Sequence, residues 1–275
     1  MFPGATTDRE AASYVVVGAP LDATTTFQPG TRFGPDRVRQ FSESYDDYDH
    51  RTASRFTDLS VHDAGDVHPW DDVSAYLDHL AAELRSVVLD DAVPATIGGE
   101  HTVTYAGVEA VDPDVLVVLD AHLDLRDDYA GNDWNHACVT RRALDTVDHA
   151  YVVGARTGSP AEWERAEADD VTVVPPEDVG EWIRSMQADG VLDGDSAYLS
   201  VDIDAADPGY APGTGTMEPF GLSPRELRDA VRAVAPHAGG VDVVEVNDRD
   251  DGQTAALAGK LLREFVFTHA ATRRD

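Results

Sequence analysis

Three short strings in the 275-residue chain combine carboxylate and imidazole side chains at spacings that suit a metal site. Asp120-Ala121-His122-Leu123-Asp124 and Asp202-Ile203-Asp204 each follow an apolar run, and His101 comes after Gly98-Gly99-Glu100. The two glycines allow the backbone to approach a neighbouring segment closely. In open α/β sheets, ligands bind beyond the carboxyl ends of the strands, so these three strand ends are where chemistry is expected.

The spacing of two within the strings predicts that their polar side chains share one side. If the extended conformation continues past the apolar run, Asp120, His122 and Asp124 point in one direction, and Asp202 and Asp204 form a second pair. A lone Asp-x-His or Asp-x-Asp in an acidic protein is usually surface polarity, and His101 alone would be a structural histidine. Their occurrence at the ends of three different strands favours a metal site instead.

The donor types indicate which metal is expected. Four converging carboxylates cannot all stay ionised without compensation, because burial and like charge both raise their pKa values. Two divalent cations supply the four positive charges required. A set of carboxylates and imidazoles without sulfur suits hard to borderline ions such as Mn²⁺ better than structural zinc. Two close ions can activate a water molecule and orient a planar electrophile.

Alternating strand and helix patterns position these strings. Short β-branched runs bounded by turn residues predict buried parallel strands at 14–18, 93–97, 115–119, 151–153, 171–174, 197–203 and 241–246. Helical patterns lie between them at 72–89, 160–168, 177–188, 223–234 and 254–267. Ser223, followed by Pro224 and with Glu226 three residues on, is a helix N-cap signal. The alternation predicts a three-layer α/β fold with a mostly parallel sheet.

The whole chain, 1–275, is predicted to form a single catalytic domain, because it contains no Gly/Ser-rich linker, internal repeat or low-complexity tract. The Pro- and Gly-rich stretch at 202–221 is too long for an ordinary connection and is predicted to be functional.

The charge balance excludes some partners. Acidic residues number 52 against 21 basic ones, of which only Lys260 is a lysine, and the net charge is −31. Such a field repels phosphates and anionic membrane surfaces, so neither nucleic acid nor membrane is an expected partner. Abundant aspartate with almost no lysine is typical of proteins from salt-accumulating cytoplasms, where molar salt screens self-repulsion.

Cellular location and redox chemistry follow from what the sequence contains. Cys138 is the only cysteine, which excludes an internal disulfide, and it is expected to be a small buried apolar residue. The N-terminus has no charged-then-apolar signal, and no apolar run reaches the roughly 18 residues of a membrane span. A soluble, cytoplasmic protein is therefore expected.

The strings resemble the motifs of the ureohydrolase family, which includes arginases and agmatinases. GGEHTVT at 98–104, DAHLDLRDDY at 120–129 and SVDIDAADPGYAPGTGT at 200–216 resemble the three metal motifs of the family. Further likeness at 17–42, 63–67 and 243–262 extends the resemblance over nearly the whole chain. It implies the arginase-like fold, with a sheet of roughly eight strands, and two Mn²⁺ ions per subunit.

The resemblance also implies roles for individual residues. One ion would be held by His101, Asp120, Asp124 and Asp202, and the other by Asp120, His122, Asp202 and Asp204, with Asp120 and Asp202 bridging. His136 resembles the mobile histidine that shuttles protons to and from the reacting amine, although without the resemblance it would be an ordinary loop histidine. Glu245 resembles the carboxylate that pairs with the substrate guanidinium; the alternative is a structural ion pair with an arginine.

The expected substrate is a small cationic guanidinium compound. The asparagine with which arginases recognise arginine is replaced by Arg126, and the acidic Asp127-Asp128 that follows favours a substrate with a terminal amine. Agmatine, giving putrescine and urea in polyamine metabolism, is therefore favoured. Aminopropylagmatine is a close second, guanidinobutyrate depends on where Arg126 points, and arginine is the least expected.

Two other classes remain possible at this point: a zinc-dependent deacetylase of the same fold, with one metal per subunit, and a noncatalytic binding protein. The family resemblance further implies a homo-oligomer, a trimer or a hexamer.

Overall fold

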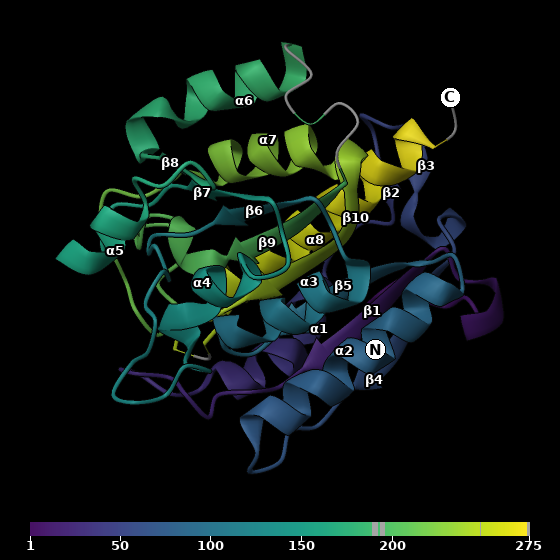
Figure 1. Cartoon of the computed structure of the whole chain (residues 1–275). Helices are drawn as coiled ribbons and strands as arrows, with labels where there is room; N and C mark the ends of the chain where they lie inside the picture. Colours follow the sequence, from purple (N-terminus) through teal and green to yellow (C-terminus); the bar gives the residue numbers. More distant parts are fainter. Residues whose placement is uncertain (189–191, 193–195, 248, 274–275) are drawn as a thin grey trace.

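The computed structural model describes residues 1–188, 192, 196–247 and 249–273. An eight-stranded sheet runs through it in the order β4-β1-β5-β10-β9-β6-β7-β8, and every neighbouring pair is parallel. The strands are β1 (Tyr14–Ala19), β4 (Val61–Asp66), β5 (Val93–Gly98), β6 (Val115–Leu119), β7 (His149–Val153), β8 (Val171–Val174), β9 (Ala197–Asp202) and β10 (Ala238–Val244). The predicted parallel α/β sheet is confirmed (Figure 1).

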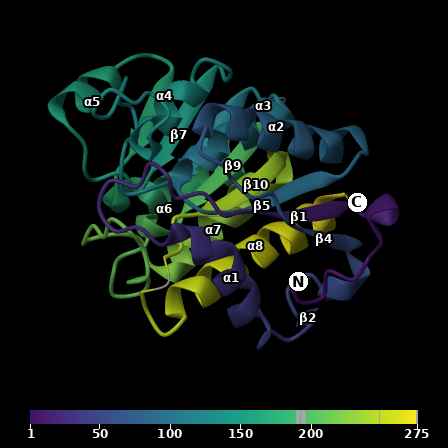
Figure 2. The same cartoon turned by 90° about the horizontal axis from the view of Figure 1, so that it is seen from below.

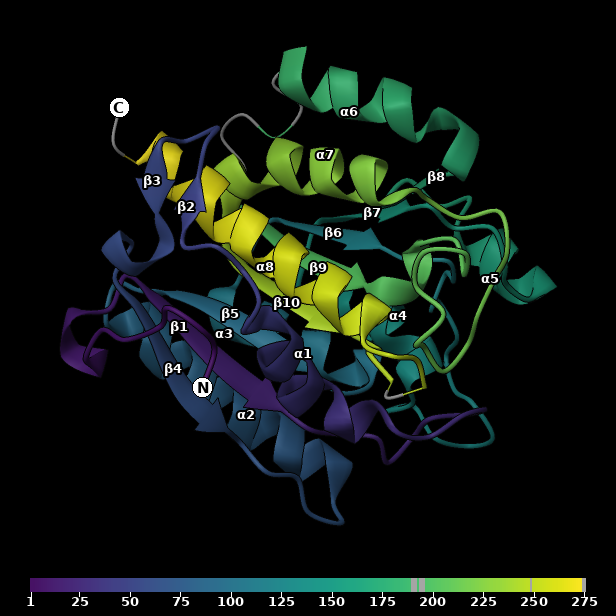
Figure 3. The same cartoon turned by 180° about the vertical axis from the view of Figure 1, so that it is seen from behind.

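Helices cover both faces of the sheet. One layer contains α1 (Gly34–Ser42), α6 (Val179–Ala188), α7 (Pro224–Val234) and α8 (Gln253–Thr272), and it is nearest the viewer in Figure 3. The other contains α2 (Val73–Leu89), α3 (Thr104–Val111) and α4 (Val139–Ala143). Figure 2 shows the sheet between α2 and α3 on one side and α1 and α8 on the other. The remaining elements are α5 (Pro160–Arg165) and a short hairpin of β2 (Tyr48–Asp49) and β3 (Ser54–Arg55).

The strands are buried on both faces, which explains their nearly continuous apolar sequences. In β1, Val15 and Val17 belong to the cluster around Leu80 of α2, whereas Val16 belongs to the cluster that contains Phe265 of α8. Successive side chains thus feed opposite layers. The Ser223 N-cap is confirmed, because its hydroxyl accepts from the N–H of Glu226 in a capping box.

Several predicted boundaries were wrong. The strand predicted at 241–246 begins at Ala238 and ends at Val244, and the one predicted at 197–203 ends at Asp202. β4 was not predicted at all, because it is an edge strand with polar residues at 62, 63 and 66. None of the described helices contains a stretch long and apolar enough to cross a lipid bilayer.

Candidate metal centre

The three predicted strings meet because their strands occupy the middle of the sheet. β5, β10, β9 and β6 are consecutive neighbours, and their carboxyl ends lie at one edge. His101 follows β5, Asp120 follows β6 and Asp202 ends β9. Gly99 is needed for the first of these turns, since a Cβ there would lie 1.9 Å from the carbonyl oxygen of Leu21. Glu245, directly after β10, completes this row of strand ends.

The polar side chains converge through turns rather than by extended alternation. β6 ends at Leu119, and Asp124 has a left-handed backbone with φ of 51°. Asp204 lies in a 3₁₀ turn, Ile203–Ala205, whose N-cap is the side chain of Asp202. The prediction that extended strand geometry continues through these strings was therefore wrong, although the side chains still come together.

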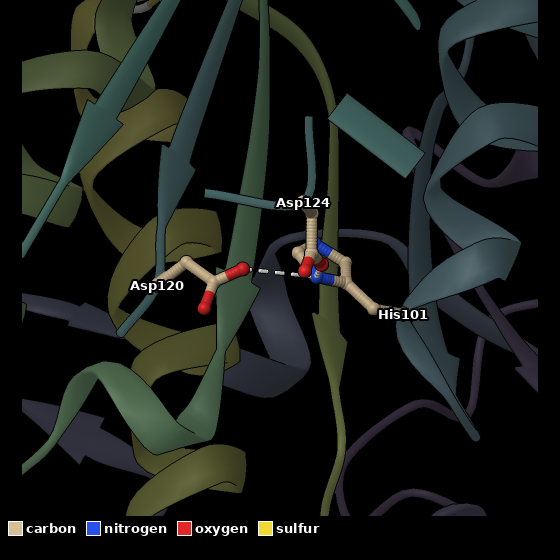
Figure 4. A group of neighbouring side chains, drawn as sticks. All are labelled: His101, Asp120 and Asp124. Carbon is tan, nitrogen blue, oxygen red and sulfur yellow. Dashed lines mark hydrogen bonds and ion pairs between the residues drawn. The ribbon is translucent and has the colours of Figure 1, made fainter. Parts of the chain in front are cut away.

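His101 is the centre of the first cluster. Its Nδ1 atom lies 3.0 Å from Oδ2 of Asp124, 3.1 Å from Oδ2 of Asp120 and 3.4 Å from Oδ2 of Asp202. Figure 4 shows the side chains of His101, Asp120 and Asp124 directed towards one another. One ring nitrogen cannot donate a proton to three carboxylates at once, so this arrangement suits a shared cation.

His122 forms the second cluster with Asp120 and Asp204. Its Nδ1 is 3.0 Å from Oδ2 of Asp204 and 3.5 Å from Oδ1 of Asp120. Asp120 is common to both clusters, and each offers at least three donor atoms to an ion. Asp202 lies beside the first cluster, with Oδ1 accepting from the backbone N–H of Asp204 at 2.8 Å. The bridging role expected of Asp202 stays a prediction.

The electrostatics of the clusters favour cation binding. Burial raises the pKa of Asp202, and the carboxylates of Asp204, Asp120 and Glu245 add to the rise. Burial and Asp120 likewise raise the pKa of Asp124 to about 6. Burial opposes the protonation of His122, but Asp204 and Asp120 outweigh it and raise the pKa to about 12. A proton on the imidazole thus compensates the negative charge of the buried carboxylates, which is the role that a divalent ion would take in the same place.

The residues fit divalent ions sterically as well. Donor atoms around one ion with bonds of about 2.1 Å lie about 3 Å apart, which is the separation between His101 Nδ1 and the oxygens of Asp120 and Asp124. Oδ2 of Asp120 is buried, and although Nδ1 of His101 lies 3.1 Å away, the oxygen accepts no well-directed hydrogen bond from the described residues. A buried carboxylate oxygen without a donor is costly unless a cation approaches it.

Glu245 has an unusual backbone and a carboxylate oxygen without a hydrogen bond to any described residue. Its φ of 61° is left-handed, a conformation that a non-glycine residue adopts at some energetic cost and that is concentrated at functional sites. Oε1 accepts from the backbone N–H of His101 at 2.9 Å, whereas the buried Oε2 has no hydrogen-bond partner among the described residues. Gly215 lies next to this oxygen, since a Cβ there would be in ordinary van der Waals contact with Oε2 at 3.6 Å.

His136 lies against Glu245. Its Nδ1 is 3.2 Å from Oε1 of Glu245, and its Nε2 is 3.2 Å from the N–H of Thr26, which donates to it. Burial opposes protonation of His136, but the hydrogen bond with Glu245 prevails and raises the pKa to about 9. The N–H of Thr26 favours the neutral ring instead, so the two contacts act in opposite directions on its proton.

A pocket of about 340 Å³ opens above the clusters. His122, Asp124, Asp202 and Asp204 line its floor, and its other lining residues are Thr26, Arg126, Tyr129, His136, Ala137, Thr157, Gly158, Ser159, Glu162 and Thr216. Glu245 is not among these lining residues, but its Oε1 contacts His136, which is. This volume suits a small-molecule substrate.

The residues at the pocket mouth differ from expectation. Arg126 lines the pocket, and its guanidinium is 3.2 Å from Oε2 of the buried Glu162. Asp127 instead pairs with Arg141 at 3.0 Å, and Asp127 and Asp128 line a neighbouring hollow. Of the acidic side chains near Arg126, Glu162 thus lines the pocket, and Asp127 and Asp128 do not.

Sequence reasoning missed the supports of the site. Glu100 is fully buried and accepts from the N–H and the hydroxyl of Thr24, both at 2.7 Å, which fixes the segment that contacts His136. Ser200 and Asp242 contact each other beneath His101. The available signal was polarity within apolar strand runs, at Ser200 and Asp242, and a charged residue next to His101.

The fold and the two carboxylate–imidazole clusters that share Asp120 suit an α/β enzyme that binds metal ions. The Arginase family model matches residues 12–268, so the chain belongs to the arginase family of ureohydrolases, which are hydrolases of linear amidines. An agmatinase of Pyrococcus horikoshii is 34% identical over 270 residues, covering 94% of this chain and 92% of that one. An N(1)-aminopropylagmatine ureohydrolase of Thermococcus kodakarensis is 33% identical over 266 residues, covering 92% and 89%.

The fold comparison agrees with the sequence comparison. The crystal structure of the agmatine ureohydrolase of Thermoplasma volcanium matches with a TM-score of 0.92 and 33% identity, over 99% of this chain and 95% of that one. The resemblance inferred from the motifs is therefore confirmed.

Proposed function

We propose that the protein hydrolyses agmatine to putrescine and urea, with two Mn²⁺ ions held by His101, Asp120, His122, Asp124, Asp202 and Asp204. The observation that carries the proposal is Oε2 of the buried Glu245, which has no hydrogen-bond partner among the described residues and lies next to two clusters that share Asp120. A guanidinium offers paired N–H donors to such a carboxylate. The agmatinase names of similar proteins support the same choice.

The chain's own residues divide the work. Glu245 accepts two N–H groups and holds the guanidinium plane over the clusters. The ions held by the two clusters would lower the pKa of a water molecule and so supply the nucleophile that attacks the guanidinium carbon. Water adds to that carbon, the bond to the alkyl nitrogen breaks, and His136 passes a proton to the departing amine. The guanidinium cation and water thus yield neutral urea and a protonated amine, so that atoms and charge balance.

The charge of the chain favours a cationic tail over a carboxylate tail. Glu162 and Arg126 pair with each other, so neither side chain is a free partner for a tail, whereas the net charge of −31 attracts an ammonium group and repels a carboxylate. Aminopropylagmatine, which carries a longer cationic tail, is the second candidate, and the similarity to the Thermococcus protein favours it.

Urea release from a substrate panel tests the proposal. The protein is assayed in molar KCl with Mn²⁺ and agmatine, aminopropylagmatine, guanidinobutyrate or arginine at equal concentration. We expect agmatine or aminopropylagmatine to be hydrolysed at least ten times faster than arginine, since one unpaired charge at the pocket mouth is worth about 1.4 kcal/mol or more. Fastest turnover of arginine contradicts the proposal.

Metal analysis on the same preparation distinguishes a ureohydrolase from a zinc-dependent deacetylase of the same fold. Two ions per subunit agree with a ureohydrolase centre, whereas one zinc ion per subunit with amide hydrolysis indicates a deacetylase.

A further inference from the structure

A buried carboxylate lies beneath the candidate metal centre without an assigned role. Asp242 is in the interior of β10 and fully buried, and the sheet register pairs it with Thr96 of β5 and Ser200 of β9. An ionisable group in such a place is destabilising unless its hydrogen bonds serve a purpose. Its Oδ1 accepts from the hydroxyl of Ser200 at 2.7 Å.

Ser200 connects Asp242 to His101. The register of the sheet pairs Asp242 of β10 directly with Ser200 of β9, so the two side chains are cross-strand neighbours. The hydroxyl oxygen of Ser200 is also 3.1 Å from Nε2 of His101. All three residues are completely buried, and neither Ser200 nor Asp242 lines the pocket.

The number of available hydrogens sets the direction of the hydrogen bonds between His101, Ser200 and Asp242. A serine hydroxyl carries one hydrogen, and that of Ser200 points at Asp242. With Asp242 ionised as the acceptor, the oxygen of Ser200 accepts from Nε2–H of His101, which leaves the lone pair of a neutral imidazole on Nδ1. Nδ1 is the atom that faces Asp120, Asp124 and Asp202. The hydroxyl of Thr104, 3.1 Å from the same oxygen, can donate to it as well.

We propose that Asp242, acting through Ser200, is a positioning residue that fixes the ring orientation and the tautomer of His101, so that Nδ1 is presented to a metal ion. The inference rests on the proposed metal-dependent function, and it adds two residues that do not touch ion or substrate. Outer partners of this kind orient the ligating histidine and raise its basicity.

The test measures Mn²⁺ binding by calorimetry and by metal analysis after dialysis at graded free Mn²⁺, with Ser200→Ala and Asp242→Asn. We expect each variant to bind one of the two ions about 10- to 100-fold more weakly, with little change in the other ion. Both substitutions interrupt the same series of hydrogen bonds. The double variant is therefore expected to bind Mn²⁺ no more weakly than the weaker-binding single variant. Multiplied losses in the double variant, or wild-type affinity in both single variants, would overturn the inference.

A control separates positioning from general loss of stability. Val243→Ala removes a buried side chain from the opposite side of β10 and lowers the melting temperature without touching the chain from Asp242 to His101. Its Mn²⁺ affinity is expected to equal that of the wild type. If Asp242→Asn does not fold, Ser200→Ala decides the question, since it deletes one oxygen only.

Ion binding is read independently of hydrolysis, so the two proposals fail differently. Wild-type protein that binds two ions and releases no urea contradicts the proposed function, whereas unchanged affinity in both variants contradicts the role of Asp242.

Discussion

At the scale of single residues, Asp202 and Glu245 stand at the ends of neighbouring strands and yet have different surroundings. Asp202 is 3.4 Å from Nδ1 of His101 and hydrogen-bonded to the N–H of Asp204. Glu245 instead contacts the backbone N–H of His101 and the ring of His136. These contacts predict that Asp202 serves the ions and that Glu245 serves the substrate.

Asp202→Asn and Glu245→Gln are expected to separate the two roles. Asp202→Asn removes charge from both proposed ion positions, so at least one ion and the activity should be lost. Glu245→Gln keeps an acceptor for the N–H of His101 and should retain two ions per subunit. It loses charge-assisted hydrogen bonds worth roughly 1.5–3 kcal/mol each, or about one to two decades in kcat/KM for each.

Metal analysis of the purified variants beside steady-state kinetics checks this contrast. Loss of metal from Glu245→Gln, or its full turnover of agmatine, would show that Glu245 is not the guanidinium anchor.

At the scale of elements, the edge of the sheet depends on one buried arginine. Arg39 of α1 donates to both carboxylate oxygens of Asp63 in β4, each at 2.9 Å, and to Oδ1 of Asp66. Among the described strands, β4 pairs with β1 alone, through four residue pairs: Tyr14–Val61, Val15–His62, Val16–Asp63 and Gly18–Asp66. The Arg39–Asp63 pair therefore ties the edge strand to the helix layer.

The same pair predicts a dependence of stability on pH. Burial raises the pKa of Asp63, but the hydrogen bonds and charge of Arg39 prevail and lower it below the ordinary 3.8. A carboxylate with a lowered pKa stabilises the fold above pH 3.8 and loses that contribution as the pH falls through its folded value. Asp63→Asn is expected to lower the free energy of unfolding at pH 7 by about 3 kcal/mol, since Arg39 loses its main partner.

Urea unfolding at pH 7 and near pH 3 checks whether the stabilisation by Asp63 decreases as the pH falls. The difference between wild type and Asp63→Asn should shrink at the lower pH, and any release of metal in acid affects both proteins. Asp78→Asn, at an exposed position of α2, is the control and should differ little from the wild type at either pH. A constant difference for Asp63→Asn across this range argues against the assigned pKa shift.

How far the sequence predicts these elements depends on whether local pattern or tertiary contact decides them. The central strands are long apolar runs and were predicted, as were α2 and α7. The sequence signal for α3 was weakened by Gly107, which is required because a Cβ there would lie 2.0 Å from the hydroxyl of Tyr198. β4 lacks an apolar pattern because Asp63 and Asp66 bind Arg39.

For the site too, local patterns in the sequence were predictive and tertiary contacts were not. Residue types at strand ends indicated the candidate ligands, because the carboxyl ends of central parallel strands meet at one edge. The left-handed conformation of Glu245 and the pairing of Ser200 with Asp242 were not predictable, since both depend on register between strands distant in sequence. The predicted functional stretch at 202–221 is held by Arg156, which donates to the carbonyls of Asp204 and Glu218 at 2.9 and 2.7 Å.

At the scale of the whole molecule, the net charge of −31 dominates the electrostatics. Even if each of the 21 basic side chains pairs with one acidic side chain, 52 − 21 = 31 carboxylates remain without a basic partner. Salt weakens exposed ion pairs such as Arg32–Asp22, but these contribute little, about 0–1 kcal/mol each. Repulsion among the excess carboxylates is therefore the larger effect, and salt should stabilise the fold.

We accordingly expect the melting temperature to rise from dilute buffer to several molar KCl, followed by circular dichroism. At about 1 M salt the Debye length is roughly 3 Å, so repulsion between exposed carboxylates is largely screened. Salt also strengthens apolar burial in some cases, and a charge variant separates this effect from screening. Asp78→Asn, Glu83→Gln and Asp91→Asn together change exposed carboxylates and bring the net charge to −31 + 3 = −28.

The triple variant should melt above the wild type in dilute buffer, because it carries less repulsion, and the two melting temperatures should converge in molar KCl, where screening removes the difference. Stabilisation by salt through apolar burial predicts instead that both proteins gain equally, since the buried core is identical in the two. A melting temperature of the wild type that does not change between dilute buffer and several molar KCl would exclude both effects and, with them, the need for high salt that the acidic composition predicts.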